Sequence, residues 1–111
     1  MKGWVVEFYD KKIERDFSRW PTGIKAKFLW ILDLVEEFGP EEIGMPHIKA
    51  LGQGLFEIRA KGLEGIGRAF FCITKGKVIL IVSGCIKKTQ KTPQDEILLA
   101  RKRVLEIKNE K

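Results

Sequence analysis

A run of cationic and polar residues late in the chain carries the most concentrated chemistry of the sequence. It reads Lys87-Lys88-Thr89-Gln90-Lys91-Thr92-Pro93. The end of this run has the pattern of a helix start, because Thr92 can act as the N-cap and Pro93 suits the first helical position. Lysines beside a helix N-terminus, with its free N–H groups and partial positive charge, favour the binding of a phosphate. A solvated basic turn is the alternative that the sequence leaves open.

Two arginines form the second candidate site. If residues 62–65 make a four-residue turn between two strands, Arg59 lies directly opposite Arg68. Like charges in this position repel each other by up to about 1 kcal/mol unless an anion separates them. Phosphate suits the guanidinium fork, which can bind it through two parallel hydrogen bonds. The alternative is that Glu57 and Glu64 neutralise both arginines on an ordinary polar sheet face.

The following hairpin would bring these arginines and the lysine run together. If Lys75-Gly76 is a two-residue turn, Arg68 lies opposite Ser83. Alternation then places Cys85 on the same sheet face, and Lys87 with it if the strand extends that far. The sequence therefore predicts a cationic surface where this sheet meets the last helix.

The other polar and aromatic candidates carry weaker signals. His47 is the only histidine, and we expect a structural role for it, with acid–base chemistry as the alternative. Cys72 and Cys85 should lie roughly 20 Å apart along neighbouring strands, too far for a disulfide, and should behave as small hydrophobes. No cofactor or metal is predicted, because no ligand pattern accompanies them. The tryptophans are expected to be core or helix-packing residues, separate from the basic patch: Trp4, Trp20 and Trp30.

The elements that must position these residues make an α+β fold. The predicted order is a strand, two helices, a three-stranded antiparallel meander and a final helix. Thr22 is the expected N-cap of the second helix, and residues 41–54 are expected to form a loop. The expected bounds are 4–9 for the first strand, 11–20 and 22–38 for the helices, 55–60, 66–74 and 77–86 for the meander, and about 92 onward for the last helix.

Apolar spacing supports these assignments. From Ile24 to Phe38 the apolar residues recur at steps of three and four, which gives a helix one apolar stripe. In the strand at 55–60 the apolar residues alternate with Glu57 and Arg59, so the two charged side chains share the opposite face. The run at 78–82 is apolar on both sides, which is typical of a central strand covered on both faces.

Composition and charge narrow the class of protein. With 111 residues, 44% hydrophobic and 32% charged, the sequence predicts one globular domain over residues 1–111. The apolar stretches fall short of the roughly 20 residues that span a membrane, and the N-terminus lacks a signal-peptide pattern, so a cytoplasmic location is expected. Residues 1–43 have a net charge of −2, and residues 44–111 have a net charge of +8. The basic half favours a polyanionic partner, with a solubilising lysine surface as the alternative.

The stretch from Lys49 to Arg103 resembles the RelE/ParE toxin superfamily, and within it the phage-derived HigB-like branch of type II toxin–antitoxin systems. The resemblance covers about half of the chain. It is carried by residues 51–59 (LGQGLFEIR), 67–71 (GRAFF) and 87–93 (KKTQKTP), followed by Glu96-Ile97 and Ala100-Arg101. The last block, at its distance from the two arginines, is the most specific.

This resemblance implies a RelE-like fold and a toxin that cleaves mRNA on the ribosome without a metal ion. In the implied reaction the ribose 2′-hydroxyl attacks the adjacent phosphate and leaves a 2′,3′-cyclic phosphate and a free 5′-hydroxyl. The implied partners are a neutralising antitoxin, often a small helix-turn-helix protein, and operator DNA reached through that antitoxin. No membrane partner is implied.

The same resemblance assigns roles to basic residues. Arg59 and Arg68 match the sheet-face cations that hold the phosphate and stabilise the charge of its transition state. The lysines of the junction match the basic end of the site, where a proton donor to the leaving 5′-oxygen would sit: Lys87, Lys88 and Lys91. The residues expected to contact RNA around them are Lys49, Lys61 and Gln90.

Ser83-Gly84-Cys85 departs from the family pattern. This branch often has His-Gly-Phe before the double lysine, so an acid–base imidazole and a stacking ring are both missing here. Two other functions therefore stay open. One is a gyrase-inhibiting toxin of the ParE type, and the other is a degenerate member that binds its antitoxin without catalysis.

Overall fold

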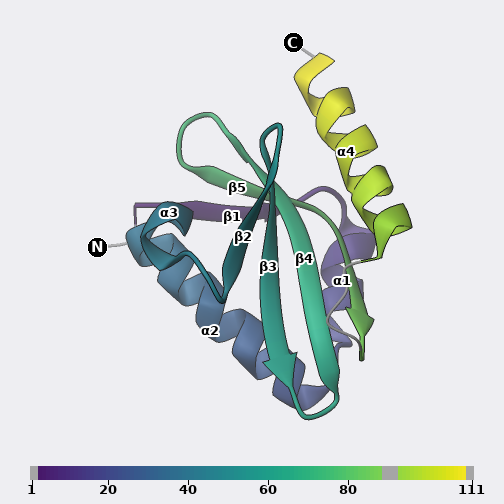
Figure 1. Ribbon diagram of the computed structural model, residues 1–111. Helices are drawn as coiled ribbons and strands as arrows, with labels where there is room; N and C mark the ends of the chain where they lie inside the picture. Colours follow the sequence, from purple (N-terminus) through teal and green to yellow (C-terminus); the bar gives the residue numbers. More distant parts are fainter. Residues whose placement is uncertain (1–2, 89–92, 110–111) are drawn as a thin grey trace.

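The computed structural model describes residues 3–88 and 93–109 of the chain (Figure 1). Over these residues it confirms the predicted α+β class and the final helix. The elements are, in order, β1(Val5–Phe8), α1(Lys11–Ser18), α2(Thr22–Phe38), α3(Pro40–Ile43), β2(Ile48–Gly52), β3(Leu55–Gly62), β4(Gly65–Thr74), β5(Val78–Lys87) and α4(Gln94–Asn109). In this part of the chain no helix is both long and apolar enough to cross a membrane.

The strands form one five-stranded sheet in the order β1-β5-β4-β3-β2. Strands β3, β4 and β5 make the predicted antiparallel meander, and β5 lies between two neighbours as expected of an apolar strand. Strand β1 pairs parallel to β5, and β2 pairs antiparallel to β3 at the opposite edge. The sheet is therefore two strands wider than the predicted meander.

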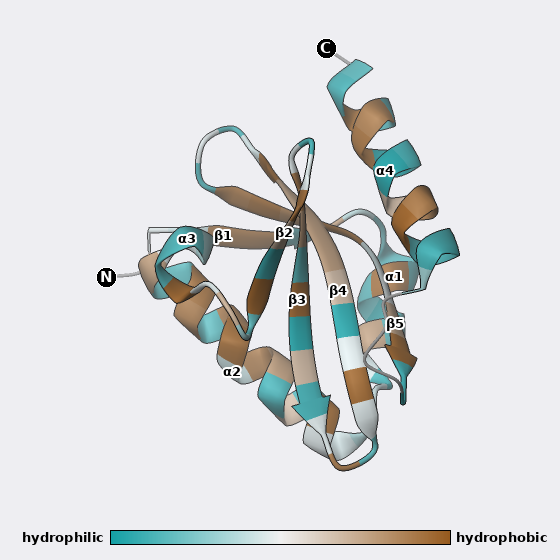
Figure 2. Ribbon diagram, in the orientation of Figure 1, coloured by the Kyte–Doolittle hydropathy of each residue, from teal (hydrophilic) through white to brown (hydrophobic). Residues whose placement is uncertain are grey.

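Helices cover the two faces of this sheet unequally. Helices α1 and α2 lie on one face, and α4 crosses the other (Figure 1). The larger core, which includes Phe28, Ile58 and Phe71, lies beneath α1 and α2. A smaller core beneath α4 joins Leu55, Phe70 and Val82 to the apolar stripe of that helix. Polar positions interrupt the otherwise apolar strands β3 and β4 near the end that α4 leaves uncovered (Figure 2).

The segment predicted as a loop at 41–54 is largely regular, so that prediction is wrong. It contains the end of the short helix α3 and the whole strand β2. Strand β2 lacks a clear alternation of apolar and polar residues, and its pairing is irregular between Ala50 and Gly52. Its place is set by the hydrogen-bonding edge of β3, which is a tertiary effect that local sequence does not report.

Thr22 does not cap α2, contrary to the prediction. Thr22 is the first helical residue, and Pro21 occupies the N-cap position without a side-chain hydrogen bond. The backbone N–H of Gly23 instead donates to the Glu64 carboxylate, at 3.1 Å, from the turn between β3 and β4. A distant acid thus satisfies one of the N–H groups that every helix start leaves without an internal partner.

The pairing of β4 with β5 differs from the predicted register by two residues. Thr74 pairs with Val78, so the turn has three residues instead of two. Because the register then shifts between Phe70 and Phe71, Arg68 lies opposite Cys85 and not opposite Ser83. The two changes together move the pairing by an even number of residues, so the predicted common face is preserved.

Candidate active site

A buried carboxylate joins the two arginines at the centre of the site. Arg59 and Arg68 are paired across β3 and β4, as predicted. Glu57, two residues from Arg59 on the same face, lies against both: its Oε1 is 2.9 Å from the Arg59 Nε and its Oε2 is 3.2 Å from the Arg68 Nε. The alternative left open by the sequence is therefore realised for Glu57, whereas Glu64 is used to cap α2.

The two arginines differ in exposure. The side chains of Arg68 and Glu57 are both fully buried, whereas the Arg59 side chain is 22% exposed. An ion pair removed from water requires close geometry to offset the loss of hydration. Arg68 is thus placed to hold Glu57, and through it the guanidinium of Arg59, which faces solvent at the rim.

On the α1–α2 face, strands β4 and β5 pack closely against an aromatic cluster that includes Phe17 and Trp20. A Cβ atom at Gly84 would lie 2.5 Å from the Phe17 Cζ, and one at Gly67 would lie 2.5 Å from the Trp20 ring. Phe17 and Trp20 also pack on each other with ring centroids 4.4 Å apart. Because the backbone under the arginines rests directly on these rings, it has little room to move.

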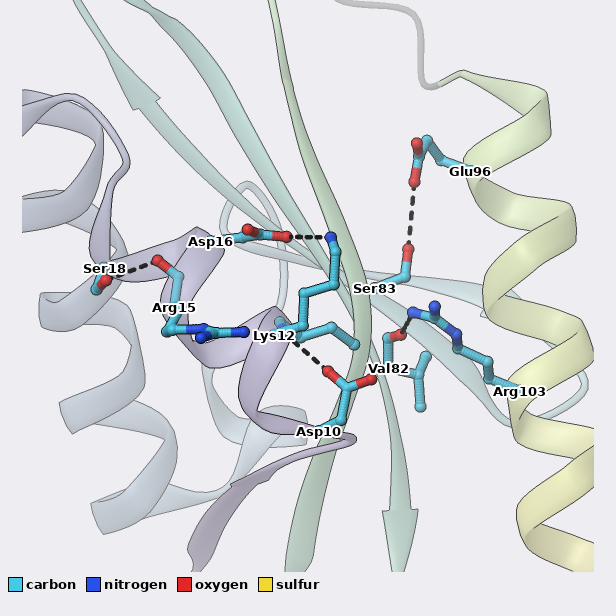
Figure 3. A network of polar contacts seen from close by, with 10 residues as sticks. Asp10, Lys12, Arg15, Asp16, Ser18, Val82, Ser83, Glu96 and Arg103 are labelled. Atoms are coloured by element: carbon cyan, nitrogen blue, oxygen red, sulfur yellow. Dashed lines mark hydrogen bonds and ion pairs between the residues drawn. The ribbon is translucent and has the colours of Figure 1, made fainter.

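Ser83 and Cys85, which depart from the family pattern, lie on the face of the sheet that α4 covers, beside the charged cluster of Glu57, Arg59 and Arg68. The Ser83 hydroxyl donates to the Glu96 carboxylate of the first α4 turn at 3.3 Å (Figure 3). Burial, and then the nearby Glu96, raise the pKa of the Cys85 thiol to about 11. Cys85 is therefore a neutral thiol at neutral pH, without the thiolate that nucleophilic chemistry requires.

Helix α4 is tied to the sheet by arginines of its own. Arg101 donates to the backbone carbonyls of Leu51 and Gly52, at 2.8 and 3.1 Å. Arg103 donates to the carbonyl of Val82, the residue at which the β5 register shifts (Figure 3). These contacts fix the helix above the small core and set its first turn beside the charged cluster.

Three of the lysines predicted for the site lie on exposed positions near the arginines: Lys61, Lys87 and Lys88. Lys87 and Lys61 flank Ile66 from the two neighbouring strands. Lys61 and Lys88 line one hollow of about 310 Å³ at the β3–β4 turn, together with Glu64. The structure thus brings Lys61, Lys87 and Lys88 to the end of the sheet at which Arg59 is exposed.

The remaining predicted site residues are placed less centrally or lie outside the described residues. Lys49 is exposed on β2, opposite Glu57. Gln90 and Lys91 fall outside the described residues, as does the predicted N-cap Thr92. Pro93 lies just before α4, and its carbonyl accepts a hydrogen bond from the Ile97 N–H at 3.3 Å.

The structure corrects the expectation that Trp30 lies apart from the basic residues, and it places His47, for which a structural role was expected, beside the site. The His47 carbonyl accepts a hydrogen bond from the Arg59 N–H at 2.8 Å, so His47 lies beside Arg59. Trp30 is 47% exposed, and its ring meets the His47 ring edge-on with centroids 5.4 Å apart. Trp30 therefore borders the basic residues and is not buried in the core. The pairing of β2 with β3 was the missing signal.

The metal-ligating residue types do not gather in the described part of the chain. Among residues 3–88 and 93–109, no group of three or more His, Cys, Asp or Glu side chains could hold a metal ion. Both cysteines are free, with Cys72 buried and Cys85 half-buried, as expected of small hydrophobes.

Comparison with known proteins gives the family. Residues 15–105 match the family model described as "Phage derived protein Gp49-like (DUF891)". A search of curated proteins finds no significant match. The matched region runs from α1 into the last turns of α4, so it includes every described residue of the charged cluster. The chain therefore belongs to the phage-derived Gp49-like family, a RelE-like family associated with toxin–antitoxin systems.

Proposed function

We propose that this protein is a HigB-like toxin that cleaves mRNA on the ribosome and thereby inhibits translation. The carrying observation is the exposed cationic end of the sheet, where Arg59 stands at the rim of a buried Arg68–Glu57 pair and lysines surround it. RNA is a polyanion whose phosphates such a surface attracts. Membership of the Gp49-like family supports a toxin role.

In the proposed reaction a ribose 2′-oxygen forms a bond to the adjacent phosphorus, and the bond from phosphorus to the 5′-oxygen breaks. The products are a 2′,3′-cyclic phosphate and a 5′-hydroxyl. Arg59 would bind the non-bridging oxygens, whose negative charge grows in the transition state. Arg68 is a positioning residue in this scheme, because it is buried and acts through Glu57.

The proton balance of the step involves the lysines at the end of β5. The proton leaving the 2′-hydroxyl passes to solvent water at this open surface, and the departing 5′-oxygen gains a proton from a protein donor, which then takes one back from water. We assign proton donation to Lys87, Lys88 or Lys91; of these, Lys87 and Lys88 lie at the end of the sheet beyond Arg59. Lys49, Lys61 and Gln90 would bind flanking parts of the RNA.

The implied partners follow from the family and the proposed activity. A toxin of such a family is neutralised by an antitoxin. We propose that this antitoxin is a small helix-turn-helix protein, that operator DNA is reached only through it, and that mRNA is met on the ribosome.

A second candidate function is a degenerate toxin that binds its antitoxin and no longer cleaves RNA. Two observations favour it. Ser83 is hydrogen-bonded to Glu96, and the Cys85 thiol is neutral at physiological pH, so neither supplies the acid–base group that the family pattern often has there. A ParE-like inhibitor of gyrase would instead leave mRNA intact.

Induced expression followed by mapping of 5′-hydroxyl RNA ends separates these functions. The wild-type protein should arrest growth and produce new 5′-hydroxyl ends in translated mRNA. Arg59→Gln and Lys87→Gln should each lower cleavage by about 10²-fold or more, since each removes a charge aimed at the transition state. Lys77→Gln, in the turn at the far end of the sheet, is the matched control and should cleave normally.

The other results identify the other functions. Arrest with intact mRNA and DNA-damage signalling would identify a gyrase inhibitor. Absence of arrest with a soluble, folded protein would identify the degenerate member. Cleavage at the wild-type rate by both site variants would overturn the assignment of the site.

A further inference from the structure

A second cationic hollow lies where the outer edge of β3 passes beyond the start of β2. The β2–β3 register ends with Ile48 opposite Ile58, whereas β3 continues to Gly62. The space beside residues 59–62 of β3 has a volume of about 450 Å³. Its walls are the side chains of Lys27, Met45, Pro46, His47, Arg59, Lys61 and Ile66.

Three separate parts of the fold supply its charge. Lys27 comes from α2, His47 from the segment before β2, and Arg59 and Lys61 from β3. Among the described residues that line the hollow, none carries a carboxylate. Burial, and then the nearby Lys27, lower the pKa of the His47 imidazole, which agrees with a surplus of positive charge around it.

Aromatic contacts hold this wall in place. The Lys27 ammonium lies 4.4 Å from the centre of the Trp30 ring, which directs it along the α2 surface. Trp30 in turn packs edge-on against His47. Among the described residues, the contact that positions this lysine is with an aromatic ring, so its charge can interact with an external anion.

We propose that this hollow binds a phosphodiester of single-stranded RNA that flanks the bond to be cleaved. The inference rests on the proposed ribonuclease function and deepens it by naming a substrate subsite. Arg59 belongs to both places: its Nε contacts Glu57 in the charged cluster, and its side chain lines the hollow. A bound phosphate here would therefore lie next to the reacting one.

The cationic surface continues from this hollow toward the β3–β4 turn. The hollow shares Lys61 and Ile66 with the smaller hollow that Lys88 lines at the β3–β4 turn. Cations from α2, β3 and the end of β5 therefore follow one another around this corner of the sheet. An extended, flexible strand can follow such a bend, and its successive phosphates meet successive cations.

The salt dependence of binding tests the subsite. The probe is a short, fully 2′-O-methylated RNA oligonucleotide, which lacks the attacking hydroxyl and stays intact. Each lost phosphate contact should reduce the slope of log K against log salt by about 0.7 for a single strand. We expect this reduction for Lys27→Gln and for Lys61→Gln, and an unchanged slope for Lys77→Gln. Unchanged slopes in both hollow variants would overturn the proposal.

His47 provides an independent readout, since it is the only histidine in the sequence. Its ring resonances in an NMR titration report directly on the hollow. Bound oligonucleotide should shift them and raise the pKa of His47, because a nearby phosphate stabilises the imidazolium form. Resonances that stay unchanged when the protein is saturated with the oligonucleotide would contradict occupancy of the hollow.

The two proposals fail in different ways. If cellular mRNA stays intact but the oligonucleotide shifts His47 and the slopes fall, the hollow binds an RNA phosphate and the ribonuclease function is wrong. If mRNA is cleaved and neither hollow variant changes binding or cleavage, the ribonuclease function stands and the subsite is wrong. A nuclease with the proposed subsite should show both cleavage and the His47 response.

Discussion

The two faces of the sheet are built from the same strands, but one face is apolar throughout and the other combines apolar and charged residues. On the α1–α2 face, alternate residues of β3 and β4 are apolar and sealed, as at Ile58 and Phe71. On the α4 face, the same strands carry an apolar patch at Leu55 and Phe70 and then a charged cluster. The alternation of a strand thus lets one face supply stability while the other holds polar chemistry.

The difference teaches where this fold tolerates charge. A buried ion pair contributes little net stability compared with apolar residues of similar size, although breaking it is costly. The Glu57–Arg68 pair is fully buried and adjoins the small core. Its presence is better explained by the need to position Arg59 than by stability.

The largest expected effect comes from breaking the charged pair on one side only. Arg68→Ala removes one of the two arginines that pair with the buried Glu57, and should lower the free energy of unfolding by about 3–5 kcal/mol. The double variant Glu57→Leu/Arg68→Met replaces both charges with apolar groups and should be close to wild type in stability. Urea denaturation followed by tryptophan fluorescence measures both.

The double variant also sharpens the comparison between the faces. It should fold and yet lose RNA cleavage, because Arg59 would lose its buried partner. A double variant as unstable as Arg68→Ala would mean that the charged cluster stabilises the fold in its own right. In that case both faces of the sheet would stabilise the fold.

A smaller effect is expected from crowding the apolar face. Gly84→Ala places a Cβ 2.5 Å from the Phe17 Cζ and 3.0 Å from the Arg68 carbonyl oxygen. Overpacking of this kind should cost about 1–3 kcal/mol of unfolding free energy. Gly3→Ala, whose Cβ would meet its nearest atom only at 3.7 Å, is the control.

A compensating change identifies the cause of that loss. Phe17→Leu in the Gly84→Ala background should restore part of the stability by retracting the ring. If the double variant recovers nothing, the Arg68 carbonyl and not the aromatic cluster limits the space at this position.

The smallest expected effect is on the pH dependence of the unfolding free energy, and it comes from His47 at the edge of the sheet. The pKa of His47 is lowered in the folded protein, so the unfolded chain binds more protons as the pH falls below the ordinary histidine value of about 6.5. The contribution of His47 to the unfolding free energy should therefore be complete above that pH and should be lost progressively as the pH falls below it. His47→Gln should remove this component from a pH series of denaturation curves. An identical pH dependence in the variant would contradict it.

Much of the charged face could be predicted from local pattern. The alternation at 55–60 placed Glu57 and Arg59 opposite the apolar residues, and the turn at 62–65 correctly set Arg59 against Arg68. Period and turn signals are properties of neighbouring residues, so a sequence reports them well. The depth of Glu57 could not be read in this way, because burial depends on what α4 and β2 cover.

The errors share a cause. Strand β2, the Glu64 cap of α2 and the position of Trp30 all depend on contacts between residues far apart in sequence. The spacing of Lys75-Gly76 suggested a two-residue turn, whereas the hairpin uses three residues and a later register shift. The fold brings Arg59, Lys61, Lys87 and Lys88 to one corner of the sheet, but the hollow beside His47 appears only after β2 is paired.

The irregularity at Val82 reverses which residues of β5 face inward, the odd-numbered or the even-numbered ones. Before it, the odd-numbered Ile79 and Ile81 point into the core beneath α1 and α2; after it, the even-numbered Gly84 and Ile86 do so. A single residue inserted or deleted within β5 between Val78 and Val82 would exchange the inward-facing and outward-facing positions on one side of the change. Length changes in this part of the strand should therefore be tolerated in steps of two residues. Arg103, which donates to the Val82 carbonyl, holds the irregular point of the strand in place.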